Sequence, residues 1–298
     1  MMPLKLPDAV SRASRKAGFH LRSLQPRSLP GLAPMFQTGV ARLRLQGAWV
    51  TNLDALSLSE TDEMLAMADR LCCQLPRGDV AFQGMAATAS HSVGLASRQL
   101  MAHPAIFLWG LQHPWLNLAE CYLRQPAAYL GCVLRREVPN QRQVGVRLWH
   151  QDGEDYKTIK VIVYLNDVAD TGGPFEYIPR SLTPAYGQFR SVNNRIDNAA
   201  MAQVVEPERW RRCPGPRGTV IVADTASVFH HASVPNCDRY SLTFAYTTAA
   251  PKHRARCLQW CPYEETQVWT DIQARLSDRQ TLALLGWRQG RYGLGQLL

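Results

Sequence analysis

Between residues 126 and 250 the sequence is dominated by short runs of β-branched and aromatic residues, and this region constrains the fold most. The runs are separated by Gly, Asn, Asp and Pro, which favour turns, and no helix long enough for a parallel crossover lies between them. The pattern therefore predicts an antiparallel sandwich or barrel. The predicted strands are residues 127–134, 144–149, 158–165, 218–223 and 240–246.

Helical patterns flank this region on both sides. Ser57-Leu-Ser-Glu60 has the spacing of a capping box, so a helix is predicted to start at Ser57. Residues 95–123 are predicted to be helical, with breaks at His103-Pro104 and His113-Pro114. Near the end of the chain, Ser277 is predicted to cap a helix over residues 278–287.

One long connection, residues 180–216, interrupts the β pattern and contains a predicted helix around residues 198–205. A connection of this length inside a compact β domain usually covers or lines a binding site. We therefore expect it to be a lid or a binding loop.

These patterns predict a mainly β protein with helices (α+β) and a single catalytic domain over residues 46–298. Within it, residues 46–125 are expected to form a helical support, 126–250 the β core and 251–298 the C-terminal helices. The first 45 residues, rich in Arg, Pro and Leu, are predicted to be a basic arm with at most one short helix.

The net charge of +9 is concentrated in the first 50 residues, which hold eight Lys or Arg against one Asp. Such a segment could bind an acidic membrane surface or an acidic carrier protein, but a solvated extension is the favoured interpretation. Nucleic acid is not expected as a partner, because aromatic residues are not interleaved with the basic ones.

No apolar run reaches the length of a membrane span, which is about 18 residues. A cytoplasmic location without a secretory signal is predicted, with the eight cysteines as reduced thiols.

The residues with the clearest chemical potential are His150 and Asp152, two positions apart at the end of a predicted strand. Side chains at i and i+2 of a strand point the same way, so an imidazole and a carboxylate are presented together. Two further histidines, His230 and His231, follow a later strand. Two imidazoles and one carboxylate at an open site form the facial triad of non-heme Fe(II) oxygenases.

Residues for a second ligand lie on neighbouring strands. Such a triad leaves three coordination positions, of which two suit an α-keto acid and one suits O2. Arg239 and Ser241 face the same way on the last strand, where a guanidinium beside a hydroxyl suits a carboxylate. Lys160 and Tyr164 share one strand face, so either could reach such a cosubstrate.

At these residues the sequence resembles the Fe(II)/2-oxoglutarate-dependent dioxygenases, and most closely their phytanoyl-CoA dioxygenase-like branch. The resemblance covers roughly residues 126–250, and the order and spacing of its motifs make it specific. It departs from the family at Ile178-Pro-Arg-Ser-Leu182, where Gly-Ser-His commonly follows the proline. The matching motifs are Trp149-His-Gln-Asp152, Tyr164-Leu-Asn-Asp-Val168, Gly172-Gly-Pro-Phe-Glu-Tyr-Ile-Pro179, Asp224-Thr-Ala-Ser-Val-Phe-His-His231 and Arg239-Tyr-Ser-Leu-Thr243.

The resemblance implies a double-stranded β-helix (jelly-roll, cupin-like) core. In it, His150, Asp152 and one later histidine would hold Fe(II), and Arg239 with Ser241 would bind the C5 carboxylate of 2-oxoglutarate. The implied reaction uses O2, releases succinate and CO2, and oxidises a C–H bond, with ascorbate as a reductant in vitro. Halogenating relatives have a small residue at the position of Asp152, so hydroxylation or a related oxidation is expected.

Two histidines compete for the third ligand position. The spacing from Asp224-Thr225 and the family pattern Phe-His-Arg/His-Gly favour His230. Asn236, five residues after His231, resembles another family pattern and favours His231. His230 is the preferred prediction and His231 the alternative.

The expected substrate is a small organic or biosynthetic molecule, which could be linked to a carrier protein or to CoA. A cupin-like metal enzyme that does not use 2-oxoglutarate is one alternative, against which the Arg239-x-Ser241 pair argues. A non-catalytic binding module on the same fold is another, against which the complete triad argues. The sequence does not predict an oligomeric state.

Overall fold

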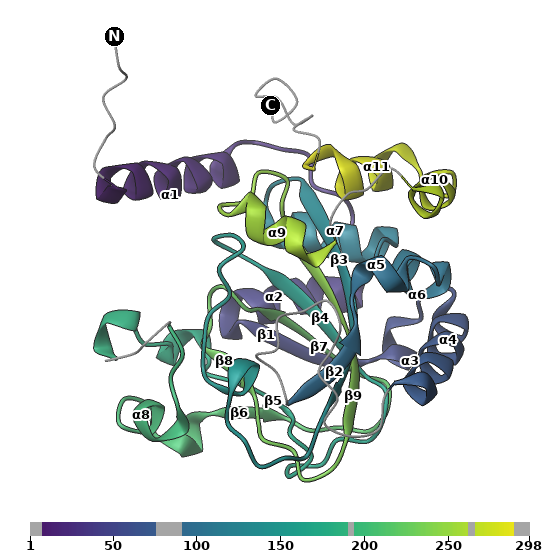
Figure 1. Ribbon diagram of the computed structural model, residues 1–298. Helices are drawn as coiled ribbons and strands as arrows, with labels where there is room; N and C mark the ends of the chain where they lie inside the picture. The colour runs from purple at the N-terminus through teal and green to yellow at the C-terminus, as the bar shows by residue number, and fades with distance from the viewer. Residues whose placement is uncertain (1–7, 76–90, 190–193, 262–265, 289–298) are drawn as a thin grey trace.

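The computed structural model describes residues 8–75, 91–189, 194–261 and 266–288. Two antiparallel sheets form its centre (Figure 1). A six-stranded sheet has the order β1-β7-β4-β9-β3-β2, and a three-stranded sheet has the order β6-β5-β8. The strands are β1 (Ala48–Asn52), β2 (Ser92–Leu95), β3 (Ala127–Glu137), β4 (Ile159–Tyr164), β5 (Phe175–Tyr177), β6 (Arg211–Cys213), β7 (Thr219–Asp224), β8 (His230–Ala232) and β9 (Arg239–Thr248).

Alternating side chains divide the large sheet into two faces, because successive residues of a strand point in opposite directions. Val161 and Val163 of β4 belong to the large core cluster that also contains helical residues. Tyr164 lies on the other face, in a second cluster with Phe175 and Tyr177 of the small sheet. The space between the sheets is therefore lined by one face of each, as in a jelly roll. The predicted α+β, antiparallel β-sandwich fold is confirmed.

Helices cover the outer face of the large sheet (Figure 1). The large core cluster joins apolar side chains of α2, α4, α6 and α7 to those of β4, β7 and β9. The helices are α1 (Asp8–Leu24), α2 (Pro34–Gln46), α3 (Leu53–Leu56), α4 (Thr61–Gln74), α5 (Ser97–Leu100), α6 (Pro104–Trp109), α7 (His113–Leu123), α8 (Asn198–Ala202), α9 (Arg254–Trp260), α10 (Gln267–Gln273) and α11 (Asp278–Thr281). No helix of the described chain is long and apolar enough to cross a membrane.

The N-terminal 45 residues differ from their prediction. They form α1 and most of α2, so the expectation of at most one short helix was wrong. Pro34 lies in the first turn of α2, where its missing N–H costs no hydrogen bond, and Gly47 ends the helix with φ +88°. Phe36 and Leu43 of α2 are buried in the large core cluster. Pro34 therefore marks the start of a helix that packs on the core.

The predicted helix start at Ser57 was also wrong. Ser57 has a left-handed backbone and ends α3, and α4 begins four residues later, at Thr61. Residues 46–125, predicted as a helical support, additionally supply β1 and β2 to the large sheet. In contrast, the breaks at Pro104 and Pro114 are confirmed, since each proline lies in the first turn of a separate helix.

Four of the five predicted strands are present as β3, β4, β7 and β9, but residues 144–149 do not form one. Instead Gly145–Arg147 is a 3-10 turn, η1, that starts at a glycine with φ +59°. The Arg147 side chain is fully buried and donates hydrogen bonds to the carbonyl oxygens of His91, Val138 and Arg142. These bonds hold the segment in a turn rather than in a strand.

The long connection contains α8 (Asn198–Ala202), which confirms the predicted helix in a shorter form, and the 3-10 turns η2 (Arg180–Leu182), η3 (Tyr186–Gln188) and η4 (Pro207–Arg209). Near the C-terminus, Ser277 caps α11 through the backbone N–H of Gln280, as predicted. The helical path then continues as a π-helix over Leu282–Gly286.

Candidate metal centre

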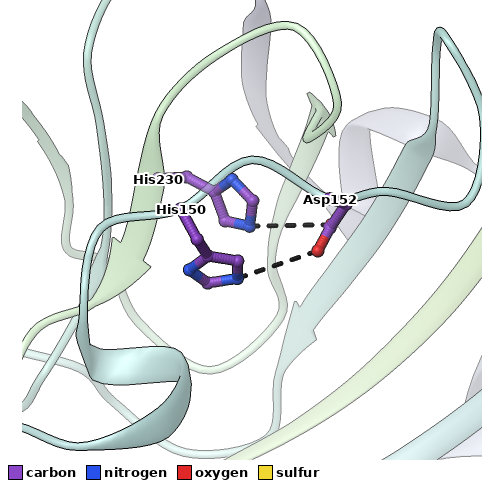
Figure 2. A group of neighbouring side chains, drawn as sticks. All are labelled: His150, Asp152 and His230. Atoms are coloured by element: carbon purple, nitrogen blue, oxygen red, sulfur yellow. Dashed lines mark ion pairs between the residues drawn. The ribbon is translucent and has the colours of Figure 1, made fainter. Parts of the chain in front are cut away.

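Three predicted residues, His150, Asp152 and His230, meet at one end of the sandwich (Figure 2). Nε2 of His150 lies 3.7 Å from Oδ1 of Asp152, and Nε2 of His230 lies 3.6 Å from Oδ2. One potential ligand atom from each residue lies within 4.8 Å of the others. Figure 2 shows both rings turning a nitrogen toward the carboxylate.

The backbone places these side chains. His150 and His230 exchange two backbone hydrogen bonds of 3.0 Å, so they are directly opposite residues of an antiparallel pair. The N–H of Asp152 donates to the carbonyl oxygen of Thr225, which follows β7. Further along the loop, buried Asp155 accepts hydrogen bonds from Thr248 and from the N–H of Lys252. These contacts fix the loop that carries Asp152.

The second nitrogen of each imidazole is already used. Nδ1 of His150 lies 2.8 Å from the carbonyl oxygen of Leu148, and Nδ1 of His230 lies 3.3 Å from that of Val228. A carbonyl oxygen only accepts, so the proton is on Nδ1 in both contacts. The lone pair is then on Nε2, which faces Asp152. Metal-ligating histidines are oriented by this type of second hydrogen bond.

The charges of the centre also suit a cation. Burial lowers the pKa of His150 well below its ordinary value and that of His230 to about 4, so both rings are neutral at pH 7. Burial alone would raise the pKa of Asp152, but the adjacent Lys160 ammonium outweighs it and holds the pKa well below the usual range. Two neutral imidazoles and an ionised carboxylate are the protonation states in which these groups bind metals.

Lys160 lies closer to this centre than its sequence position indicated. Its Nζ is 2.6 Å from Oδ2 of Asp152 and lies 5.1 Å from the centre of the Trp260 ring on α9. Lys160 therefore contacts the candidate ligand itself and balances its negative charge.

His231, the alternative third ligand, points to the other side of β8. Its Nδ1 lies 2.9 Å from the carbonyl oxygen of Arg147 and its Nε2 lies 2.8 Å from Oε2 of Glu176. Its ring stacks on Trp149 with 3.9 Å between centroids. Both ring nitrogens are occupied by protein atoms, and the alternation of strand residues explains why only His230 reaches Asp152.

Arg239 and Ser241 are buried on the inner face of β9, deeper between the sheets. Ser241 lies directly across from Tyr164 of β4 and from Arg135 of β3. Arg239 donates to the carbonyl oxygen of Gly173 and lies 3.9 Å from Glu137, while its buried Nε has no hydrogen-bond partner among the described residues.

Glu137 is shared by several cations. It lies 3.5 Å from Arg147 and 3.9 Å from both Arg135 and Arg239. One carboxylate therefore faces three guanidinium groups, and this end of the space between the sheets has an excess of positive charge. An added carboxylate would find both charge and an unsatisfied donor there.

Tyr164, predicted as a possible cosubstrate contact, is instead held by the protein backbone. Its fully buried hydroxyl donates to the carbonyl oxygen of Cys213 and accepts from the N–H of Phe175, at 2.9 and 2.8 Å. It thus connects β4 to β5 and β6 of the small sheet.

We expect Tyr164→Phe to lower the free energy of unfolding by about 1–3 kcal/mol, because it leaves a buried N–H and a buried carbonyl without a partner. Denaturant unfolding measures this change, and affinity for 2-oxoglutarate should stay within about twofold of the wild type. A large loss of that affinity at unchanged stability would instead place the hydroxyl in a ligand site.

Two residues near the centre were not predicted from the sequence, Tyr186 and Arg195, both on the long connection. The Tyr186 hydroxyl accepts a 2.7 Å hydrogen bond from the N–H of Gln151, between the two candidate ligands. Arg195 precedes Ile196, which forms an antiparallel bridge with Trp149. Both contacts join segments far apart in the sequence, and no local pattern identifies them.

No family model matches the sequence, and no curated protein matches it either. Solved structures do match. The non-heme α-ketoglutarate-dependent epimerase SnoN from nogalamycin biosynthesis is 18% identical, with 78% of this chain and 90% of that one covered and a TM-score of 0.51. AviO1 from Streptomyces viridochromogenes is 18% identical over 76% of this chain and 98% of its own, with a TM-score of 0.50. EctD from S. alaskensis, solved with bound Fe, is 16% identical over 77% and 82%, also with a TM-score of 0.50.

These likenesses define the fold. The chain has the double-stranded β-helix fold that non-heme, α-ketoglutarate-dependent enzymes use, so the resemblance noted in the sequence is confirmed at the level of the fold. The His150–Asp152–His230 cluster joins the two sheets of that fold, because His230 belongs to β8 and Asp152 bonds to Thr225 just after β7.

Proposed function

We propose that the protein is a non-heme Fe(II)- and 2-oxoglutarate-dependent enzyme that oxidises a C–H bond of a small organic molecule, by hydroxylation. The observation that carries this proposal is the His150–Asp152–His230 cluster, in which two neutral imidazoles and a carboxylate face one point. Two histidines and one carboxylate with open positions favour non-heme Fe(II) over structural zinc, which takes four protein ligands.

The metal fits the donor set on this chain. His150 and His230 each present Nε2 while a backbone carbonyl holds the proton on Nδ1, and Asp152 supplies an anionic oxygen. In this proposal a bound metal takes the place of the Lys160 ammonium as the partner of Asp152. When bound, Fe(II) with 2-oxoglutarate supplies the oxidising chemistry, with O2 consumed and succinate and CO2 released.

The cosubstrate also fits. We assign the C5 carboxylate of 2-oxoglutarate to Arg239 and Ser241, supported by the unsatisfied Nε of Arg239 and by the excess of positive charge around Glu137. Lys160 and Asp152 lie nearer the end of the sheets, so a ligand between the two groups spans from the metal toward β9. These residues bind and orient the cosubstrate, and the surrounding buried side chains exclude water.

The proposed reaction type, hydroxylation, rests on the family resemblance rather than on the fold. SnoN, with a similar fold, is an epimerase, so the fold alone does not specify hydroxylation. A carboxylate at residue 152 supports hydroxylation over halogenation through the family resemblance. Three further statements remain predictions from the sequence. They are the linkage of the substrate to CoA or to a carrier protein, the boundary between the basic arm and the catalytic domain at residue 45, and the cytoplasmic location.

The test is binding and turnover by the purified full-length protein. Under anaerobic conditions, Fe(II) should bind, and 2-oxoglutarate should then produce a new charge-transfer absorption band. With O2 and ascorbate, succinate should form from 2-oxoglutarate even without the primary substrate, at a slow uncoupled rate. Absence of both the band and succinate would contradict the proposal and favour a cupin-like metal enzyme without this cosubstrate.

We expect Asp152→Ala to lower Fe(II) affinity by at least about 100-fold, beyond the typical effect of losing an outer-shell contact, because it removes the anionic ligand. Equilibrium dialysis of Fe(II) under anaerobic conditions measures this loss. The matched control is Asp271→Ala, since Asp271 is exposed and accepts a hydrogen bond from Gln267 on its own helix. Equal metal affinity in the two variants would exclude Asp152 as a ligand.

A further inference from the structure

Arg195 lies directly beside the candidate metal centre through backbone geometry. Trp149 and Ile196 exchange two backbone hydrogen bonds, of 2.7 and 3.0 Å, in an antiparallel bridge. In such a pair the next residue of one segment lies opposite the preceding residue of the other, so Arg195 lies opposite His150. His150 is thus flanked by His230 on one side and by Arg195 on the other.

Side chains on the two faces of this antiparallel pair have different surroundings. Trp149 and Ile196 pack together in an apolar cluster with Met201 and Trp210 of the connection. Opposite residues of an antiparallel pair point to the same face and neighbours to the other, so the Arg195 side chain shares the face of His150. Burial lowers the pKa of Arg195 and the Asp152 carboxylate opposes this shift, which agrees with the placement of Arg195 beside the centre.

Most donors of Arg195 are uncommitted within the described part of the chain. Its Nη1 donates to the carbonyl oxygen of Gly145 at 3.1 Å, and no described carboxylate forms an ion pair with it. The side chain is half-buried. A partly desolvated guanidinium without a carboxylate partner binds anions more strongly than an exposed one, because solvent screens it less.

Tyr186 adds a hydroxyl at the same place. Its oxygen accepts from the N–H of Gln151, and no described group accepts its own proton, so the O–H can donate to a ligand. The ring is held edge-on against Phe229 with 4.6 Å between centroids. Arg195 and Tyr186 therefore offer donors from the long connection, beside His150 and Gln151.

The C5 carboxylate of the proposed cosubstrate is assigned to Arg239 and Ser241, not to Arg195. Asp152 has Lys160 as its partner, which the metal replaces in the proposed function, and the cations near Glu137 are the ones assigned to the C5 carboxylate. Arg195 remains as a positive charge on the connection side. Its guanidinium is therefore available to a further anion.

We propose that Arg195, together with the Tyr186 hydroxyl, binds an anionic group of the primary substrate, so that the substrate is a small molecule carrying a carboxylate or a phosphate. This inference rests on the proposed function and specifies its substrate class. The planar guanidinium can hold either group through two parallel hydrogen bonds. Anchoring the substrate at one end fixes the distance of its C–H bonds from the metal, which is the main requirement for selective oxidation.

The test uses the full-length protein loaded with Mn(II) and saturating 2-oxoglutarate, in which no turnover occurs without O2. Calorimetry measures binding of inorganic phosphate, of benzoate and of neutral benzamide as the uncharged match for benzoate. We expect at least one anion to bind and benzamide to bind at least about tenfold more weakly. Arg195→Gln should weaken anion binding at least about tenfold and leave 2-oxoglutarate affinity within about twofold.

Arg209→Gln is the matched control, because Arg209 lies on the same connection, is 58% exposed and pairs only with exposed Glu206 among the described residues. It should bind the anions as the wild type does. Arg195→Lys keeps the charge and should retain part of the affinity, and it serves as the test variant if Arg195→Gln melts below the assay temperature. Preference for phosphate or for benzoate identifies which anionic group the site takes.

The inference is overturned if the wild type binds neither anion, or if Arg195→Gln and Arg195→Lys bind them as tightly as the wild type. It is also overturned if Arg195→Gln loses 2-oxoglutarate affinity instead, since Arg195 would then hold the cosubstrate. Failure of the wild type to bind metal or 2-oxoglutarate in a preceding titration contradicts the proposed function itself. The two failures are therefore seen in separate measurements.

Discussion

His230→Ala should lose Fe(II) binding and 2-oxoglutarate turnover, whereas its neighbour His231→Ala should keep both and lose stability. The reason is the alternation of β8: His230 presents Nε2 to Asp152, while His231 lies between Glu176 and the Arg147 carbonyl oxygen. Removing a buried partner of Glu176 should lower the free energy of unfolding by about 2–4 kcal/mol. Loss of one iron ligand should lower Fe(II) affinity by at least about 100-fold.

Anaerobic Fe(II) dialysis and denaturant unfolding separate these effects when both are measured on each variant. His20→Ala is the control, because His20 is exposed on α1 and, among the described residues, loses its ring contact with Phe19 alone. Metal binding that survives in His230→Ala but is lost in His231→Ala, at a temperature where both are folded, would reverse the assignment.

The positions of four strands were predictable because the residues of each strand are local in the sequence. The β-branched runs that form β3, β4, β7 and β9 are continuous in the sequence. Their apolar composition predicts that these strands are buried. The segment 144–149 has the same composition, yet the buried Arg147 side chain and its backbone acceptors form a turn. Those acceptors lie on other segments, so no local pattern shows the difference.

The candidate site was predictable to the same extent. His150 and Asp152 lie together as predicted, but the strand expected to present them is absent, and Asp152 lies on a loop held by the carbonyl oxygen of Thr225. The choice between His230 and His231 depends on which of them faces inward, which is set by pairing with β5 and with His150. Arg195 is brought to the centre only by its neighbour's bridge to Trp149, across a long connection. Lys160 was placed on the correct strand face, but its contact with Asp152 depends on the folded loop.

The long connection is more firmly anchored than a free lid. At its start Arg180 donates to Tyr122 and pairs with buried Asp224, at 2.6 and 3.1 Å. Further along, Nε1 of Trp149 donates to Asn198 at 2.8 Å, and the Trp149 ring packs on the ring of Trp210. These contacts make the described parts of the connection a wall of the site, which suits a residue that must position a substrate.

Arg239→Gln should raise the 2-oxoglutarate concentration required for binding by about 10- to 100-fold, while Fe(II) affinity stays unchanged. The substitution removes the charge-assisted hydrogen bonds to the C5 carboxylate, and each tenfold loss corresponds to about 1.4 kcal/mol. It leaves the metal ligands untouched, because Arg239 lies on the inner face of β9 near Gly173 and Glu137. Anaerobic titration of the charge-transfer band with 2-oxoglutarate measures the shift.

Two further variants make this result specific. Arg211→Gln, at an exposed position of β6, removes the same charge and should not change the titration. Arg239→Lys keeps a charge without the planar pair of donors and should fall between the wild type and Arg239→Gln. An unchanged titration in Arg239→Gln would move the cosubstrate carboxylate to another cation, of which Arg135 is the nearest across the strands from Ser241. Because Arg195 and Arg239 are assigned to different ligands, their variants should affect the binding of the anionic substrate and of 2-oxoglutarate respectively.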